Sequence, residues 1–534
     1  MKALLKRYIK GAARRLVRIG LPPNRAALPP GEPCLPLSSQ ALDHDDGPSP
    51  SYARILAGGH DYTAAGNIAI QCIEIGRYDL DFLYDASLWL IYRGRLAELL
   101  DVVYPRFLRV AYPLKWRLDP ASKTKLSNYC WEIGQEVLGK NGLRECLPFF
   151  YLANTVETKP QINFCIDLLH AVGRLKDQAT ELADRLHDEL GEFPCNSIGA
   201  VVWGDEYVEA YLNYHVRSLL APGNLPALTT SRNFLTIVTT HRGADQIRQH
   251  PIYEDLIKHC SVYFFCFPET LAEFRHYSNP DYLFYLLYGA LDHVNIFFAR
   301  HLNANVMLLP VDAIVGNGSL VNLVKYVNQG YDCCGNSNLV AKKETFLPAL
   351  DALFPDGQPI TLSTHELASL ALRHRHQYVT SQLVSAENTD FGKWPRELFY
   401  PVEGGVIVRA IYMHPLIVSG RALRGDVVFP FKWVDFLLPD RIVPGPDFGR
   451  MKVITDCTEV YISNFAPGIR LFETSGEPFS VENFVAAHLH SRPVHRFMWQ
   501  HQQFIPCTIA ERTSRDPETD AAEILAILNN RAPL

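Results

Sequence analysis

The sequence predicts an α/β protein in which N-terminal helical repeats precede a mostly parallel β-sheet flanked by helices. Helical periodicity dominates from Tyr52 to about Leu220, and after that point short apolar runs alternate with helix-like segments. Such alternation is typical of a parallel sheet with helices on both faces. A chain of 534 residues is long enough for two or three domains.

The composition argues against several classes of protein. The formal net charge of -6 argues against nucleic acid as the main partner, because such partners usually leave a basic footprint. No apolar run is long enough to span a bilayer. The cysteines show neither a C-x-x-C pair nor zinc spacing, so we interpret them as reduced core residues of a cytoplasmic protein.

The first twenty residues are basic. Residues 1–20 contain seven Lys and Arg and no acid, with apolar residues at helical spacing, and a Pro/Gly/Ser-rich linker follows at 21–51. One interpretation is an amphipathic helix that lies at an anionic membrane surface, peripheral to the inner face. The other is a solvated, frayed terminus. Both remain open.

Residues 52–220 are expected to form helix pairs that turn at Gly76, Gly94, Gly142 and Gly173. The stretch from Trp131 to Pro160 resembles a tetratricopeptide repeat. It has an aromatic and a small residue in its first helix, Gly142 at the turn, and a terminal proline. The next glycine follows after 31 residues, near the family's spacing of roughly 34. The resemblance implies a helical solenoid, whose surface would bind a protein partner or pack on the next domain.

Residues 221–512 are predicted to form the α/β domain, and 513–534 a C-terminal tail with a short helix. Predicted strands lie at 234–239, 262–267, 306–309, 404–412 and 451–464, and predicted helices at 281–302, 318–329, 364–379, 481–502 and 521–528. The strands are short and rich in apolar or β-branched residues, as expected for buried strands.

The most informative stretch runs from Asn305 to Leu320. A buried strand ends at Pro310, Asp312 follows at once, and a Gly316-Asn317-Gly318 turn precedes Ser319, which we expect to cap a helix. Ligands of open α/β sheets bind beyond the carboxyl ends of the strands. An acid and a helix N-terminus there suit a phosphate-bearing ligand. Alternatively, Asp312 is only a turn former or helix cap.

Segment 230–330 resembles the nucleotide-binding half of GT-A glycosyltransferases, which have the nucleotide-diphospho-sugar transferase fold. The wider pattern resembles bacterial proteins that combine helical repeats, a P-G-N-L-P linker and a later H-P motif. In that family a D-x-D motif holds Mg²⁺ or Mn²⁺ against the donor diphosphate. This chain has Val311-Asp312-Ala313 there, so only one acid, Asp312, matches.

The resemblance implies a set of donor-site and metal-site residues. The nucleotide sugar would contact Thr239, Asp312, Asn317, Gly318, Glu403 and His414, and a divalent cation would bind Asp312 and His490. The alternative for His414 is a buried, hydrogen-bonded histidine. His488 and His490 would share a face only on a strand.

Three acids are candidate catalytic bases. Glu403 precedes Gly404-Gly405, Asp435 lies in W-V-D-F, and Asp456 lies in V-I-T-D-C-T-E, three residues before Glu459. Each could take a proton from an acceptor hydroxyl. Glu403 could equally be a turn acid, and Asp456 with Glu459 could share a cation or stabilise a helix start.

The motifs of other enzyme classes are absent from the sequence. There is no G-x-S-x-G elbow, no Walker loop and no G-x-G-x-x-G. We therefore expect a glycosyltransferase that moves a sugar from a nucleotide sugar to a glycan, lipid or protein acceptor in bacterial surface-glycan or protein-glycosylation chemistry. The alternative is a non-catalytic repeat scaffold with a degenerate sugar-nucleotide domain, which the single acid at Asp312 would fit.

Overall fold

The computed structural model describes residues 48–59, 61–114, 120–141, 143–157, 160–191, 193–274, 280–337, 339–355, 357–423, 438–440, 442–443, 445, 447–468, 473–489 and 491–531. The predicted basic helix at 1–20 and nearly all of the linker at 21–51 lie outside these residues, as do Asp435 and His490. Among the described helices, none has the length and apolar character needed to cross a membrane.

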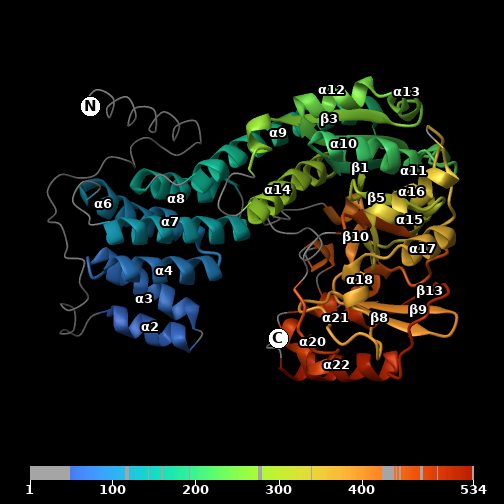
Figure 1. Ribbon diagram of the computed structural model, residues 1–534. Coiled ribbons are helices and arrows are strands. Elements are labelled where there is room, and N and C mark those ends of the chain that lie inside the picture. The colour runs from blue at the N-terminus through green and yellow to red at the C-terminus, as the bar shows by residue number, and fades with distance from the viewer. Residues whose placement is uncertain are drawn as a thin grey trace. The chain divides into compact units, whose positions relative to one another are not determined.

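The described chain divides into two compact units, and the division falls within helix α9 (Pro160–Leu190). The first unit is helical. It contains α2 (Pro50–Gly58), α3 (Tyr62–Glu74), α4 (Leu80–Tyr92), α5 (Leu96–Glu98), η2 (Leu99–Val103), α6 (Tyr104–Leu114), α7 (Pro120–Asn141) and α8 (Leu143–Val156). Figure 1 shows α2, α3, α4, α7 and α8 one above the next, and each packs on its neighbour in this series.

Two of the predicted glycine turns are confirmed. Gly76 and Gly94 follow α3 and α4 with φ values of 82° and 69°. This left-handed conformation is one that glycine adopts without steric cost, and it commonly ends a helix. Gly142 lies outside the described residues.

The helix pair that resembles a tetratricopeptide repeat forms, but the regular repeat does not continue. Gly134 of α7 lies so close to Phe150 of α8 that a Cβ would sit 2.8 Å from the ring. Gly173, expected at the next turn, lies inside α9, which continues for 17 residues beyond it to Leu190. A glycine within a helix costs only about 1 kcal/mol, which packing readily outweighs. A repeat solenoid is therefore not confirmed.

The second unit is built on a seven-stranded mixed sheet of order β11-β6-β10-β4-β1-β2-β3. Its strands are β1 (Cys195–Val201), β2 (Arg232–Thr240), β3 (Ser261–Phe267), β4 (Asn305–Leu308), β6 (Cys333–Asn336), β10 (His414–Val418) and β11 (Met451–Val453). Strands β1 to β4 are parallel, β10 is antiparallel to β4 and β6, and β11 is parallel to β6. The predicted strands at 234–239, 262–267 and 306–309 are β2, β3 and β4.

The second unit also contains helices of various lengths. They are α10 (Asp205–Ala210), η3 (Tyr211–Val216), α11 (Arg217–Leu219), η4 (Leu225–Ala227), α12 (His241–Gln249), α13 (Ile252–Leu256), η5 (Glu269–Leu271), α14 (Pro280–His301), α15 (Ser319–Asn328), α16 (Lys343–Leu353), α17 (Thr364–Arg373), α18 (Gln377–Ser381), η6 (Gly420–Leu423), η7 (Phe448–Arg450), α20 (Val481–Ala487), α21 (Pro493–Trp499) and α22 (Pro517–Arg531).

Helices cover both faces of the sheet. On one face α14 packs on Gly199 of β1, where a Cβ would lie 2.8 Å from the Asn295 side chain. Ile198 and Ala200 point to the other face, as side chains alternate along a strand. There they join the core cluster shared with η3, α11, α13 and α15.

Strand β1 is central, and the sequence pattern does not reveal it. The pattern predicts helix throughout 52–220, and this expectation is wrong at Cys195–Val201. All seven residues are buried, so no polar alternation marks a strand, and Asn196, Ser197 and Gly199 have low β-propensity. The close packing of α14 requires the small residue at Gly199.

Two three-stranded sheets complete the unit, with the orders β5-β12-β7 and β13-β9-β8. Their strands are β5 (Ala313–Val315), β7 (Leu339–Lys342), β8 (Glu397–Val402), β9 (Gly405–Ala410), β12 (Ile462–Ala466) and β13 (Gln503–Pro506). The strand expected at 451–464 is β11 and β12, which belong to different sheets because a turn at Asp456 separates them. The helix expected at 481–502 is also divided, into α20 and α21, and Pro493 begins the second.

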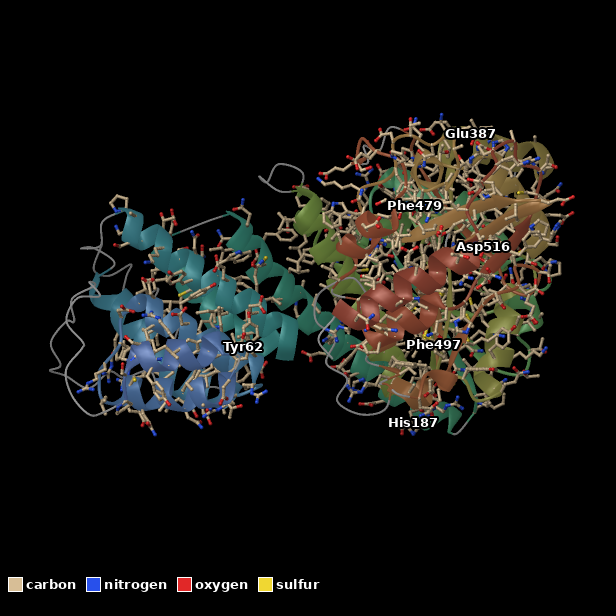
Figure 2. All side chains as sticks on the ribbon, turned by 90° about the horizontal axis from the view of Figure 1, so that it is seen from below. Tyr62, His187, Glu387, Phe479, Phe497 and Asp516 are labelled. Atoms are coloured by element: carbon tan, nitrogen blue, oxygen red, sulfur yellow. The ribbon has the colours of Figure 1, made fainter. Side chains whose placement is uncertain are left out.

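The C-terminal helix α22 packs into the second unit. Asp516, labelled in Figure 2, caps the helix by accepting a hydrogen bond from Thr519 N at 2.9 Å. Its buried side chains, Ala521, Ile524 and Leu528, join a core cluster with Trp499. Residues 517–531 are therefore part of the folded core.

Candidate functional site

The carboxyl ends of β1 to β4 meet at one edge of the sheet, and the strand order reverses between β1 and β4. From β1 the chain moves outward to β2 and β3, then returns past β1 to form β4. In open α/β sheets this reversal leaves a crevice where ligands bind. Trp203 follows β1 and Asp312 follows β4, so these two residues flank the reversal.

Asp312 lies where the sequence predicts it, just past the end of β4. It is half-buried in a turn, between the buried residues Val311 and Ala313. Its backbone oxygen accepts a hydrogen bond from Phe465 N at 2.8 Å, which ties the turn to β12. The helix-cap alternative is wrong, because α15 begins only at Ser319.

His414 begins β10 at the same edge, because β10 runs antiparallel to β4. Its Nε2 lies 2.6 Å from the carbonyl oxygen of Leu308, the last residue of β4. Since a carbonyl only accepts, Nε2 carries the proton and donates it. The alternative of a hydrogen-bonded histidine therefore holds at Nε2, although the side chain is half-buried and not buried. The imidazole fastens the start of β10 to the end of β4.

Thr239 lies at the end of β2 but is fully buried beneath α12. Gly243 of that helix is so close that a Cβ there would sit 2.3 Å from Thr239 Oγ1. The neighbouring Thr240 caps the helix by accepting from Gly243 N at 3.1 Å. The donor-contact assignment for Thr239 is therefore wrong, since the helix covers the side chain.

Asn317 and Gly318 bind another loop of the chain. Asn317 Oδ1 accepts from Gly223 N at 2.7 Å, and Gly318 N donates to Asn224 Oδ1 at 3.1 Å. Asn224 Oδ1 also accepts from Leu320 N at 3.2 Å, so it caps α15. The expected phosphate site at this helix end is therefore wrong, because its first amides are already bonded.

Ser319 does not cap α15. Its Oγ lies 3.2 Å from both the nitrogen and the oxygen of Tyr461, so it bonds to the backbone next to β12. The N-cap position is Gly318, with a φ of 96°. The sequence-based expectation of a serine cap is wrong because the cap comes from Asn224, far away in the sequence.

Glu403 lies in a hairpin turn that belongs to a different sheet from β1 and β4. It occupies the exposed turn of the β8–β9 hairpin, next to Gly404, whose φ is 75°. Six residue pairs separate this turn from Ala410, the end that leads to His414, which is about 20 Å of strand. The structure thus favours the turn-acid alternative for Glu403.

Asp456 follows β11 at the same sheet edge but lies three strands from β4, or about 14 Å. It is exposed, and its Oδ1 accepts from Thr458 N and Thr458 Oγ1, each at 2.7 Å. Glu459 accepts from the Tyr326 hydroxyl instead of pairing with Asp456. Asp456 is therefore a turn former, and the proposed acid pair does not form.

The described residues do not assemble a metal site. Within them, no three His, Cys, Asp or Glu side chains come together. Of the two expected ligands, only Asp312 is described. His488 is buried, and its Nε2 lies 2.6 Å from the Pro395 carbonyl oxygen. Asp435 and His490 stay predictions outside the described residues.

Sequence reasoning missed Trp203. Its ring packs at 5.8 Å from Phe267, at 5.5 Å from Phe284 and at 6.4 Å from Tyr288, so aromatic side chains from β3 and α14 gather at the end of β1. Just beyond it, Asp205 pairs with Arg242 at the start of α12. The signal was the W-G-D-E sequence, which becomes informative only once β1 is recognised as a strand.

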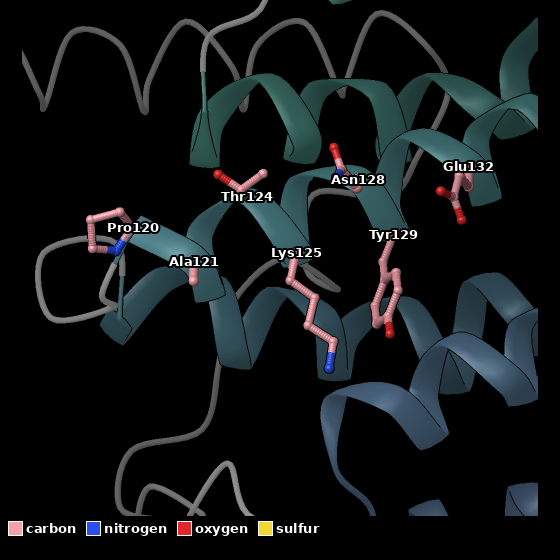
Figure 3. Close-up of a pocket in the computed structure, with 7 residues that line it drawn as sticks. All are labelled: Pro120, Ala121, Thr124, Lys125, Asn128, Tyr129 and Glu132. Atoms are coloured by element: carbon pink, nitrogen blue, oxygen red, sulfur yellow. The ribbon is translucent and has the colours of Figure 1, made fainter.

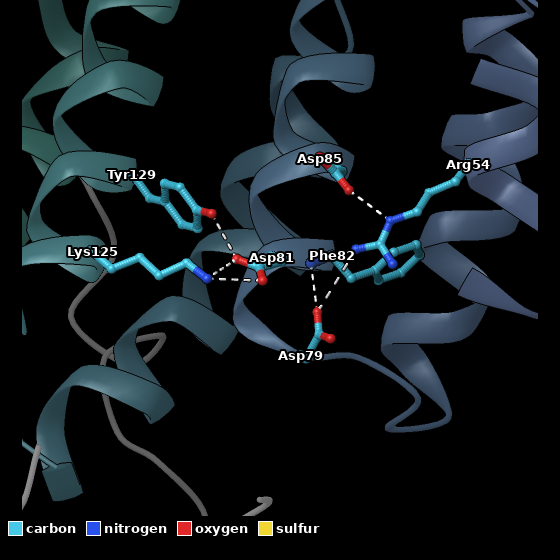
Figure 4. Close-up of polar contacts among 7 residues, drawn as sticks. All are labelled: Arg54, Asp79, Asp81, Phe82, Asp85, Lys125 and Tyr129. Carbon is cyan, nitrogen blue, oxygen red and sulfur yellow. Dashed lines mark hydrogen bonds and ion pairs between the residues drawn. The ribbon is translucent and has the colours of Figure 1, made fainter. Parts of the chain in front are cut away.

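The helical unit carries a separate hollow along α7, shown in Figure 3 and lined by Pro120, Ala121, Thr124, Lys125, Asn128, Tyr129 and Glu132. Lys125 Nζ lies 2.7 Å from Asp81 of α4, and the Tyr129 hydroxyl donates to Asp81 at 2.6 Å. Arg54 of α2 binds Asp85 at 2.8 Å, on the other side of α4 (Figure 4). These contacts join α2, α4 and α7.

The same contacts set the charge of Asp81. Burial raises the pKa of its carboxyl, but hydrogen bonds from Lys125 and Tyr129, together with the positive charges of Lys125 and Arg54, outweigh burial, and the net pKa lies below its usual value. The carboxylate therefore serves the packing of the helices.

Comparisons with known proteins add little to this geometry. No family model and no curated protein matches the chain. A mutant of the Thermobaculum terrenum O-GlcNAc transferase is a structural match with 13% sequence identity and a TM-score of 0.16. The match covers 40% of this chain and spans 40% of the length of that one. At that TM-score the likeness bears on neither fold nor function.

Proposed function

We propose that the second unit is a glycosyltransferase that binds a nucleotide sugar at the crevice between β1 and β4. The observation that carries this proposal is the reversal of strand order there, with Trp203 past one strand end and Asp312 past the other. The order β3-β2-β1-β4 also supports it, because it matches the first four positions of the doubly wound order 3-2-1-4-5-6, in which the ligand binds at the reversal.

The two sides of the crevice suit the two ends of a donor. The aromatic cluster around Trp203 offers a surface for a nucleobase, and stacking on an aromatic ring contributes about 1–3 kcal/mol per base. The Asp312 carboxylate accepts hydrogen bonds from ribose or sugar hydroxyls. A divalent cation that arrives with the donor would let the same carboxylate hold the diphosphate.

Transfer forms a bond from an acceptor oxygen to the anomeric carbon and breaks the bond from that carbon to the diphosphate, which leaves. An inverting reaction needs a base for the acceptor proton. Glu403 lies in an exposed turn of another sheet and Asp456 in an exposed turn three strands from β4, so Asp435 is the remaining prediction for this role.

The partners follow from the same proposal. The acceptor is a glycan, a lipid or a protein, in bacterial surface-glycan or protein-glycosylation chemistry. The helical unit recruits the acceptor or a partner protein, and the basic segment 1–20 contacts an anionic membrane surface.

A thermal-shift screen tests the donor site. The purified chain is melted with UDP, GDP, CDP and CMP, each with and without Mn²⁺. We expect one nucleotide to raise the melting temperature, and Asp312→Asn to weaken its binding by at least tenfold. Glu403→Gln is the matched control, because it neutralises an exposed turn acid, and it should bind as the wild type does. Equal binding by the Asp312 and Glu403 variants would refute the assignment of Asp312.

A second candidate is the non-catalytic scaffold. It is favoured by the single acid at Asp312 and by the absence of any three-ligand cluster within the described residues. The same screen separates the two. A shift that needs metal supports the transferase with a cation, and a shift indifferent to metal supports the transferase without one. If none of the four nucleotides changes the melting temperature, the result supports the scaffold.

A further inference from the structure

Two segments that are far apart in the sequence bind each other next to Asp312. Residues 215–224, which include the start of the P-G-N-L-P motif, lie against residues 313–320. The hydrogen bonds join His215 Nδ1 to Ala313 O (2.8 Å), Ser218 Oγ to Val315 N (3.0 Å), Asn224 Oδ1 to Gly318 N (3.1 Å) and Leu320 N (3.2 Å), and Asn317 Oδ1 to Gly223 N (2.7 Å). We call residues 215–224 the template, because their hydrogen bonds hold residues 313–320 in place.

The template side chains are polar and buried. His215, Ser218 and Asn224 are each at most 1% exposed. Burying a polar group costs free energy unless it is hydrogen-bonded, so three such residues around one segment restrict its backbone. His215 also lies in the π-helical segment η3, and π-helical turns are rare and frequently occur at functional sites.

The template reaches the residue next to Asp312. His215 donates to the oxygen of Ala313, while Phe465 N donates to the oxygen of Asp312 itself at 2.8 Å. Two consecutive carbonyl groups are thus held from two directions. Because the two peptide groups that follow the Asp312 Cα are held by hydrogen bonds, the carboxylate starts from a defined position at the crevice.

We infer that His215 is a positioning residue for Asp312, supported by Ser218 and Asn224. The inference rests on the proposed function, because it gives Asp312 a ligand to meet. The net contribution of one buried hydrogen bond corresponds to a change of up to about tenfold in an equilibrium constant. We therefore expect loss of the His215 hydrogen bond to weaken nucleotide binding about tenfold.

Three variants isolate this role. His215→Leu removes the donor, and His215→Asn keeps an N–H close to the place of Nδ1. His488→Leu is the matched control. His488 is also buried and bonded to a backbone carbonyl, but its contacts are Pro395, Tyr412 and Phe484. Hydrogen exchange of the amides in 313–320 is measured in each protein, together with the affinity for the nucleotide found in the screen.

In His215→Leu we expect at least tenfold faster exchange at Val315, Gly318 and Leu320 and about tenfold weaker nucleotide binding. His215→Asn should restore both, and His488→Leu should change neither. Exchange in 313–320 that is as slow in His215→Leu as in His488→Leu would overturn the inference. If the wild type binds no nucleotide, the proposed function fails, while the exchange data still decide whether the template holds the segment.

Discussion

Two buried histidines are expected to make the second unit labile to acid. Burial lowers the pKa of His215 to about 4, although the hydrogen bond to the Ala313 carbonyl opposes the shift. Burial lowers the pKa of His488 to about 4 in the same way, against the hydrogen bond to the Pro395 carbonyl. In the unfolded chain both imidazoles titrate near about 6.5.

The sign of the effect follows from which state binds protons first. As the pH falls below the unfolded pKa, the unfolded chain takes up protons that the folded chain does not, so the folded state loses stability. The contribution is complete above about pH 6.5 and is lost as the pH falls toward about 4. At pH 5 each histidine lowers the free energy of unfolding by about 2 kcal/mol. The two effects should add to about 4 kcal/mol, because the two side chains share no partner.

The double variant His215→Asn and His488→Gln removes both titrations while keeping an N–H for each carbonyl. Urea unfolding at pH 8, 6 and 5 gives the free energy of unfolding of both proteins. The carboxylates contribute equally to the pH dependence of the two proteins. The difference between the two pH profiles therefore gives the contribution of the two histidines. Between pH 8 and 5 the wild type should lose about 4 kcal/mol more than the variant.

Parallel pH profiles for the wild type and the double variant would refute this reasoning. They would mean that neither imidazole is held neutral by the fold. The double variant could also be less stable than the wild type at every pH. Such a result would still support the reasoning if its free energy of unfolding changes less with pH, because the prediction concerns the change with pH.

Two further predictions concern other parts of the chain. Arg217 is 4% exposed and donates to four backbone carbonyl oxygens at 2.6–3.1 Å. Arg217→Met should therefore lower the free energy of unfolding by about 3–5 kcal/mol, and Arg217→Lys by about half as much, in urea titrations. An Arg217→Met variant as stable as the wild type would contradict this role. The full chain should sediment with anionic vesicles and not with neutral ones, and the sedimentation should weaken with salt, because residues 1–20 carry seven positive charges and no acid. Equal sedimentation with both kinds of vesicle would rule out an electrostatic contact.

The strands that the sequence predicts are those whose residues carry the signal themselves. Strand β2 is rich in β-branched and aromatic residues, and β4 is mostly apolar and ends two residues before Pro310. Strand β1 contains Asn196, Ser197 and Gly199, and the closely packed helix α14 leaves no room for a side chain at Gly199. Because the sequence pattern does not reveal β1, it does not reveal Trp203 as a candidate either. Trp203 becomes a candidate only when it is known to follow the end of a strand.

The candidate site also contains residues that the local sequence predicts and residues that it does not. The position of Asp312 follows from the end of β4 a few residues earlier, so local pattern is enough. Asn317 and Gly318 look like a ligand-binding turn, but their partners are Gly223 and Asn224, more than 90 residues away. Nothing in a single sequence pairs two such loops.

The central claim is that the crevice between β1 and β4 transfers a sugar. Its most direct test is the release of nucleoside diphosphate from the matching nucleotide sugar, with water as the acceptor. We expect slow, steady release by the wild type, at least tenfold less by Asp312→Asn, and an unchanged rate for Glu403→Gln. Nucleotide binding with no release, or equal release by the wild type and Asp312→Asn, would contradict the claim.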